Sequence, residues 1–190
     1  MTVLETLSSP HPARLSARDF LLLAESGAFE QYARAELIEG EIFVVNAQYR
    51  RHANVRRQLV RLFEDALAGR TDGLGVLDEC SVAFDDASIP QPDIVLTIEP
   101  DGDGPIPIAS VRLIVEVADT TLAQDLGRKQ RLYARHAIPE YWVADLSVGR
   151  VLRMWRPDGD GYTQRDEWAL GKCVESATIA GLVVQTVELK

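Results

Sequence analysis

The spacing of apolar residues in the first third of the chain predicts a short helix, a hairpin and a longer helix. Residues 16–27 begin with Ser16, a good N-cap, followed by an acidic residue at the third position. Residues 35–47 alternate as two short strands around Glu39-Gly40, which suits a tight turn. Residues 49–69 predict an amphipathic helix that ends at Gly69. Its apolar stripe comprises Val55, Leu59, Leu62, Phe63, Ala66 and Leu67.

The pattern downstream predicts strands and one further helix. That helix runs from Leu122 to about His136 and stops before Pro139. This order predicts an α/β (α+β) fold with a central mixed β-sheet flanked by helices. The expected strands are residues 73–86, 91–99, 111–117, 140–146 and 149–157, the last two forming a hairpin, with a loop at 100–107 and short strands or coil in the tail.

Length and composition indicate one globular domain. The chain has 190 residues, of which 46% are hydrophobic and 26% charged. We expect an aperiodic N-terminal arm at Met1–Leu15 and a single domain at residues 16–190. No apolar run approaches the roughly 18 residues of a membrane span, and the start lacks the pattern of a signal peptide, so we expect a cytoplasmic protein. Cys80 and Cys173 lack metal-site spacing and are predicted to be buried apolar fillers.

The net charge of −9, taken alone, argues against a protein that binds nucleic acid through a broadly basic surface. Basic residues nevertheless occur in two groups. Arg56, Arg57 and Arg61 are most simply the solvated face of the 49–69 helix. The groups comprise Arg50, Arg51, Arg56, Arg57 and Arg61, and then Arg128, Arg131 and Arg135.

Two charged residues stand where apolar residues are expected. Strand alternation places Glu116 on one face with Ile114, where a carboxylate is costly unless it is paired, bound to a metal or at an open edge. Helical periodicity places Lys129 inside the apolar stripe of the 122–136 helix, on the same side as Tyr133. The short connection between the strand and the helix directs Lys129 toward Glu116. We therefore interpret the two charges as parts of one site.

Neighbouring polar residues extend this interpretation. Asp125 is four residues before Lys129 and could hold it by a weak ion pair, and Thr121 with Gln124 predicts a capping box. Asp93 follows Pro92 at the start of a strand, and it lies beside Glu116 if that strand pairs with residues 111–117.

Two carboxylates and an ammonium group have a known use together. The carboxylates hold Mg²⁺, or alternatively Mn²⁺, which polarises a phosphodiester and lowers the pKa of a bound water. The ammonium group orients that water or stabilises charge on phosphorus.

The stretches "AELIEGEI", "QPDIVL" and "LIVEVADTTLAQDLGRKQRLYARHAIPEYWVAD" resemble the Uma family of restriction endonuclease-like proteins, in the PD-(D/E)XK nuclease superfamily. The resemblance extends from about Leu15 to Leu189. It implies a restriction endonuclease-like fold and divalent-metal-dependent nuclease chemistry. By the same resemblance, the residue roles are Asp93 as the first acid, Glu116 as the second acid, Lys129 as a lysine displaced to the helix, and Glu36 as an additional early acid. The superfamily's ordinary lysine position is Ala118 here.

Each candidate also has an ordinary structural explanation. Asp93 could cap a turn, Glu116 could pair with Arg112, Lys129 could extend past Tyr133 to solvent, and Glu36 could be an exposed strand residue. The secondary candidates Gln91 and His52 are weaker, because one is chosen by adjacency and the other is a lone histidine at a helix start. Tyr141 and Trp142 are expected in the core or at an interface.

These observations favour a divalent-metal-dependent endonuclease that hydrolyses phosphodiester bonds in nucleic acid, DNA rather than RNA. Its metal ligands would be Asp93 and Glu116. The alternative is a catalytically inactive protein that keeps the nuclease fold as a binding or assembly module, which the acidic net charge and Ala118 favour. A homodimer would suit an enzyme that cuts both strands, although the residues themselves do not indicate one.

Overall fold

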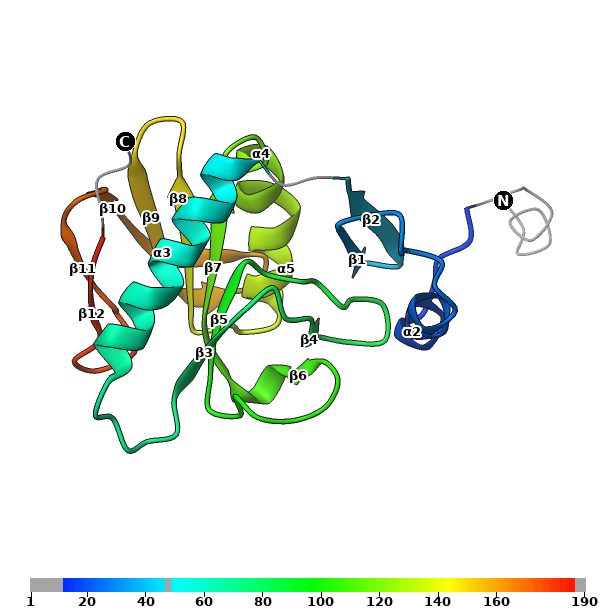
Figure 1. Cartoon of the computed structure of the whole chain (residues 1–190), viewed down its shortest axis with the longest axis horizontal. Coiled ribbons are helices and arrows are strands. Elements are labelled where there is room, and N and C mark those ends of the chain that lie inside the picture. The colour runs from blue at the N-terminus through cyan, green and yellow to red at the C-terminus, as the bar shows by residue number, and fades with distance from the viewer. Residues whose placement is uncertain (1–11, 47–48, 187–190) are drawn as a thin grey trace.

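A six-stranded mixed sheet forms the centre of the computed structural model, which describes residues 12–46 and 49–186 (Figure 1). The strand order is β10-β9-β8-β7-β5-β3. Only β7 and β8 are parallel neighbours in this sheet, and the other pairs are antiparallel. The predicted α/β fold with a mixed sheet is confirmed. The strands of this sheet are β3 (Gly75–Asp78), β5 (Ile94–Thr97), β7 (Val111–Ala118), β8 (Glu140–Asp145), β9 (Arg150–Asp158) and β10 (Gly161–Ala169).

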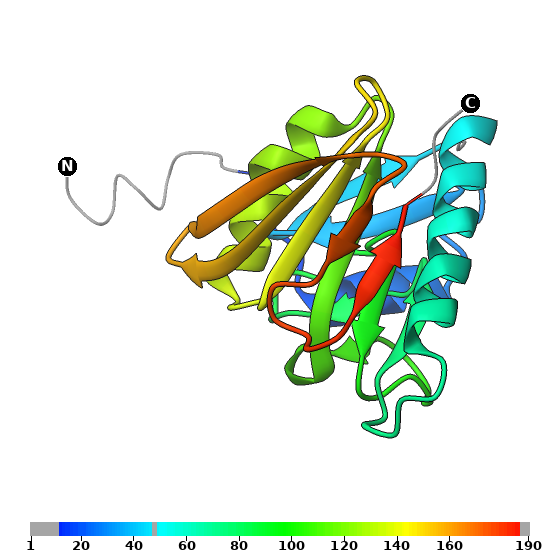
Figure 2. The same ribbon diagram turned by 90° about the vertical axis from the view of Figure 1, so that its left-hand side faces the viewer.

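Helices cover both faces of the sheet (Figure 2). The helix α3 (Arg50–Leu67) packs on the face that carries Leu113, Val115 and Val117 of β7, and its predicted apolar stripe is the side that packs. The helical segment Leu122–Arg135 packs on the other face, which carries Ile114 and Glu116. Strand alternation thus places Glu116 of β7 in the layer that also contains Lys129.

The connection from β7 to β8 is one helical segment with a π-helical turn in its middle. It consists of α4 (Leu122–Gln124), the π turn η2 (Asp125–Lys129) and α5 (Gln130–Arg135). Gln130 N–H donates to the Asp125 carbonyl, five residues earlier. The capping box predicted from Thr121 and Gln124 is wrong, because the Thr121 hydroxyl instead donates to the Asp125 carboxylate at 2.6 Å.

The N-terminal part forms a separate lobe beside the sheet (Figure 1). The helix α2 (Ala17–Glu25) begins with the predicted capping box between Ser16 and Asp19. The hairpin of β1 (Arg34–Ile38) and β2 (Glu41–Val45) turns at Glu39 and Gly40 as predicted, with φ of 52° and 79°. The Leu15 N–H donates to the Gly40 carbonyl, which ties the end of the predicted arm to this turn. Residues 1–11 of that arm lie outside the described residues.

Several boundaries differ from the sequence predictions. The predicted strand 73–86 is divided into β3 and β4 (Val82–Ala83), and β4 pairs with β6 (Ile106–Pro107) inside the predicted loop. A 3₁₀ turn, η1 (Ile108–Ser110), follows β6. The hairpin of β8 and β9 is confirmed, but the tail contributes a nine-residue strand, β10, where short strands or coil were expected. The tail ends with a small hairpin of β11 (Cys173–Glu175) and β12 (Val183–Gln185).

A buried carboxylate fastens the C-terminal loop to the sheet. Glu140 at the start of β8 is 0% exposed. Its oxygens accept hydrogen bonds from the Trp142 indole at 2.6 Å, the Ser176 hydroxyl at 2.6 Å, and the Thr178 N–H at 2.9 Å and hydroxyl at 2.7 Å. A buried carboxylate without these donors would be strongly unfavourable, so the loop position depends on Glu140.

The cysteine prediction is wrong, because Cys173 is exposed and Cys80 is only half-buried, and both are free thiols. Arg56 is also not simply solvated: its side chain is 13% exposed and pairs with Asp78 and Glu79. Tyr141 and Trp142 lie in the core as expected. Within the described ranges, no helix is long and apolar enough to cross a membrane.

Candidate active site

The pairing of β5 with β7 brings Asp93 next to the end of β7. Ile94 pairs with Val115, which meets the condition set for placing Asp93 beside Glu116, and Asp93 directly precedes Ile94. The Val117 N–H donates to Asp93 Oδ2 at 2.7 Å. Asp93 therefore lies against Val117, the residue that follows Glu116. The exposed fraction of Asp93 is 2%.

Two cationic or polar side chains complete the surroundings of Asp93. Arg34 Nη1 lies 3.0 Å from Asp93 Oδ1, and His52 Nε2 lies 3.1 Å from Oδ2. Burial alone would raise the pKa of Asp93, but the His52 hydrogen bond and the charges of Arg34 and Lys129 outweigh burial and lower that pKa. Asp93 is thus ionised at neutral pH.

Lys129 lies between two acids. Its Nζ is 2.9 Å from Glu116 Oε1 and 2.9 Å from Glu36 Oε1, and Lys129 is only 1% exposed. The Tyr133 hydroxyl donates to Glu116 Oε1 at 2.7 Å. Lys129 therefore does not extend to solvent, and Glu116 pairs with Lys129 rather than with Arg112. Three elements, β1, β7 and η2, each supply one charge to this group.

Burial and charge act in opposite directions on these groups. Burial is the largest influence on Glu116, and with the neighbouring acids Asp93 and Glu36 it outweighs the Lys129 charge and raises the pKa of Glu116 to about 8. For Lys129, burial would lower the pKa, but Glu116 and Glu36 outweigh burial and raise it above its ordinary value. Lys129 therefore stays charged.

The remaining predicted candidates have different positions. The Gln91 N–H donates to Glu36 Oε1 at 2.8 Å, whereas its side-chain amide donates to the Glu79 carbonyl, so Gln91 contributes through its backbone. Asp125 is 3% exposed and accepts from Thr121, while the described ion pairs of Lys129 are with Glu36 and Glu116; the predicted pair of Asp125 with Lys129 is not formed. Its pKa is raised, chiefly by burial.

Sequence reasoning missed two members of this cluster, Arg34 and Tyr133. For both residues, the spacing in the sequence indicated a position beside the predicted site residues. Arg34 is two residues before Glu36 in β1, and residues two apart share one face of a strand. Tyr133 is four residues after Lys129, on the same helical stripe. The contact of Arg34 with Asp93, from a distant segment, was not visible from local periodicity, whereas the partner of Tyr133, Glu116, was already expected near this stripe.

The cluster contains more buried acidic groups than cationic ones. Four carboxyl groups lie around the ammonium group of Lys129 and the guanidinium of Arg34, whose side chain is 9% exposed. A buried excess of acid favours uptake of a proton or of a further cation. The four acids are Glu36, Asp93, Glu116 and Asp125.

The donor set is suited to Mg²⁺, although it does not form a cage. Among residues 12–46 and 49–186, no group of three or more His, Cys, Asp or Glu side chains is arranged to hold a metal ion. Mg²⁺ is usually bound by one or two carboxylates, with water and substrate phosphate supplying the other ligands. Asp93 and Glu116, one from each of two paired segments, meet that requirement in ligand type and number.

A family model described as "Putative restriction endonuclease" (Uma2) matches residues 17–185. The chain belongs to this family. A solved structure, that of a putative nuclease belonging to DUF820 from Anabaena variabilis ATCC 29413, has a TM-score of 0.68 and 19% identity, and the match covers 92% of this chain and 95% of that one. At this identity the likeness shows a shared fold. No curated protein matches the chain. The family membership confirms the resemblance drawn from the motifs around Asp93, Glu116 and Lys129.

Proposed function

We propose that the protein is a divalent-metal-dependent endonuclease that hydrolyses phosphodiester bonds in nucleic acid, DNA rather than RNA, with Mg²⁺ or Mn²⁺ as the metal. The observation that carries this proposal is the buried meeting of Asp93, Glu116 and Lys129 at adjacent ends of β5 and β7, in a chain of the Uma2 family. Charged groups are rarely fully buried unless they are paired, and buried clusters of titratable groups with shifted pKa values are concentrated at functional sites.

Asp93 and Glu116 would hold the metal, and Glu36 would adjust the charge around it. When bound, Mg²⁺ supplies polarisation of the phosphodiester and a lower pKa for a bound water. Arg34 and His52 keep Asp93 ionised and oriented, so that its carboxylate is an anionic ligand at neutral pH.

Lys129 supplies a fixed positive charge beside the reaction site. It is anchored from two sides by Glu36 and Glu116, at 2.9 Å each, so its ammonium group cannot move away easily. In a buried environment such a charge stabilises negative charge that develops on a phosphate more strongly than it would in water. The lysine thus takes the role that Ala118 cannot perform.

The test is cleavage of a panel of plasmid DNA, linear duplex, single-stranded DNA and RNA with Mg²⁺ or Mn²⁺. We expect cleavage by the wild-type protein and its loss in Asp93→Asn, Glu116→Gln and Lys129→Met. A matched control is Asp145→Asn, which alters a buried acid that pairs with Arg150 outside the cluster. Equal activity in Asp93→Asn and wild type, or dependence on no metal, would refute the proposed site.

A binding or assembly module on the same fold is the second candidate. It is favoured by Arg34 and Lys129, which already pair with the two proposed metal ligands Asp93 and Glu116, and by the net charge of −9. Absence of cleavage across the whole panel, together with retained binding of nucleic acid or protein, would select it. Sedimentation of the wild-type protein tests the homodimer expected for cleavage of both strands.

A further inference from the structure

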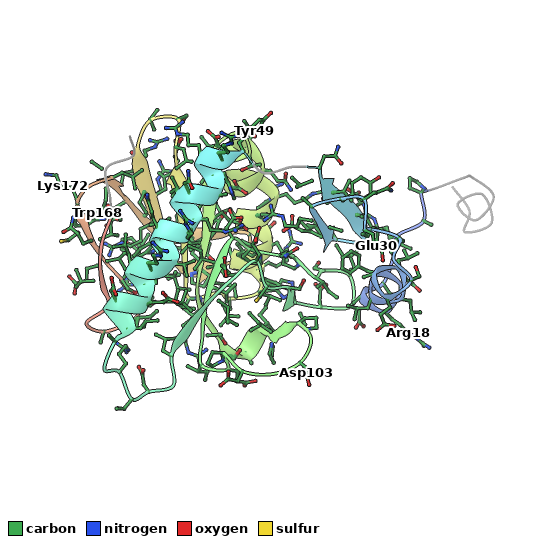
Figure 3. The ribbon with its side chains drawn as sticks, viewed as in Figure 1. Arg18, Glu30, Tyr49, Asp103, Trp168 and Lys172 are labelled. Atoms are coloured by element: carbon green, nitrogen blue, oxygen red, sulfur yellow. The ribbon has the colours of Figure 1, made fainter. Side chains whose placement is uncertain are left out.

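A pocket of about 80 Å³ opens beside Asp93 on the side of Arg34 and His52. It lies between the start of α3 and the turn that connects β7 to α4, and is bordered by Tyr49, Asp119 and Thr121. Figure 3 shows Tyr49 at the start of α3. A single water needs roughly 10–15 Å³ of such space, so the pocket has room for a larger polar group.

Two side chains that line this pocket, Arg34 and His52, each contain a buried nitrogen without a hydrogen-bond partner among the described residues. These atoms are Arg34 Nε and His52 Nδ1. The described hydrogen bonds of Arg34 all leave from Nη1, to Asp93 and to the Gln91 carbonyl. The side chain of Arg34 is 9% exposed, and a buried donor without a partner is costly. A ligand oxygen in the pocket would satisfy it.

The start of α3 adds positive potential to the same pocket. This 18-residue helix has no side-chain hydrogen bond at its N-cap, Tyr49, and no acidic residue in its first turn. The first turn instead contains Arg50, Arg51 and His52. Free backbone N–H groups and the helix dipole make such an end favourable for an anion. Asp119 is the one acid described in the pocket wall, and it is partly neutralised by Arg51 at 3.5 Å.

We propose that this pocket is the subsite for a phosphate group of the nucleic-acid strand, and that Arg34 is its positioning residue. Arg34 bridges Asp93 on one edge and a phosphate oxygen, through Nε, on the other. This inference rests on the proposed nuclease function. A guanidinium group is suited to such a bridge, because its five N–H donors point in fixed directions and serve two acceptors at once.

Inorganic phosphate is the probe, because its binding does not require cleavage. We expect phosphate to shift the NMR signals of Arg34 Nε–H and the His52 ring in the wild-type protein. Arg34→Gln should weaken phosphate binding at least about tenfold. Arg34→Lys keeps the charge but cannot serve Asp93 and the phosphate at once, so it should also weaken phosphate binding, by a smaller factor of about three or more. The matched control is Arg70→Gln, at the other end of α3, where Arg70 pairs with Asp72. It should bind phosphate as wild type does.

Phosphate that leaves the Arg34 and His52 signals unmoved would overturn the subsite, as would a folded Arg34→Gln variant with unchanged phosphate binding. If Arg34→Gln does not fold, the wild-type signals and Arg34→Lys decide the question alone. Cleavage measured in parallel separates the two proposals. Phosphate bound at Arg34 without cleavage refutes only the nuclease activity, and metal-dependent cleavage without phosphate at Arg34 refutes only the subsite.

Discussion

Replacing Lys129 by methionine tests whether the buried cluster is held by charge. Methionine keeps much of the volume and the unbranched shape of lysine but removes the ammonium group. Glu36 and Glu116 then remain buried without the cation that lies 2.9 Å from each. Each keeps one hydrogen bond, from the Gln91 N–H at 2.8 Å and from the Tyr133 hydroxyl at 2.7 Å.

The expected loss is large because the remaining charges stay in the core. Removing one partner of a buried ion pair costs about 3–5 kcal/mol, and we expect Lys129→Met to approach that range at a pH above 8, where Glu116 is ionised in the wild-type protein. Glu116→Gln in the same chain removes one of the stranded charges. The double variant should therefore recover about 1–3 kcal/mol relative to Lys129→Met alone. The penalty of Lys129→Met should also shrink as the pH falls, because Glu116 takes up a proton.

Urea unfolding followed by circular dichroism measures these differences. Arg135→Met is the control, because Arg135 pairs with Glu39 and Asp160 at the surface with 44% of its side chain exposed, and its midpoint should barely change. A Lys129→Met variant as stable as this control would show that the acids are neutralised by another route. A double variant that is less stable than Lys129→Met would contradict the charge argument as well.

Four further predictions concern separate features. The folded-state pKa of Glu116 is raised from 4.5 to about 8, so the native state binds an extra proton and the free energy of unfolding should fall as pH rises between these values. Binding of Mg²⁺, measured by calorimetry, should be weaker below pH 8, where Glu116 is protonated. Glu116→Gln should remove both pH dependences. Glu140→Ala should destabilise the protein by more than about 3 kcal/mol in urea unfolding, because each buried donor left without an acceptor costs about 1–3 kcal/mol. Gly40→Ala should lower the melting temperature by a few degrees, since φ is 79° and the new Cβ would lie 2.7 Å from Arg14 Cβ. Ellman's reagent should modify exposed Cys173 before half-buried Cys80, whose thiol pKa is raised by burial and by Asp78.

The sequence predicted the sheet and the grouping of charges because both depend on short-range periodicity. Alternation alone assigned Glu116 to the face opposite Val115, and helical spacing alone assigned Lys129 to the inward stripe. The role of Arg34 could not be predicted in the same way. Its contact with Asp93 joins residues 59 positions apart and depends on how the β1–β2 hairpin lies against the sheet. The π turn was also unforeseen, because one extra residue in a helical turn leaves little trace in an apolar pattern.

Because Lys129 lies on a helical segment, its contact with Glu116 requires that segment to be packed on the sheet. Glu116 belongs to a central strand, whereas its counter-charge belongs to a segment that packs on the sheet from one side. Partial undocking of residues 122–135 would remove the cation and leave the carboxylates in place. Hydrogen exchange would detect such opening as low protection in this segment alone. If hydrogen exchange shows such opening, the charge balance of the cluster depends on the docking of this one segment, a dependence that a lysine on β7 itself would not have.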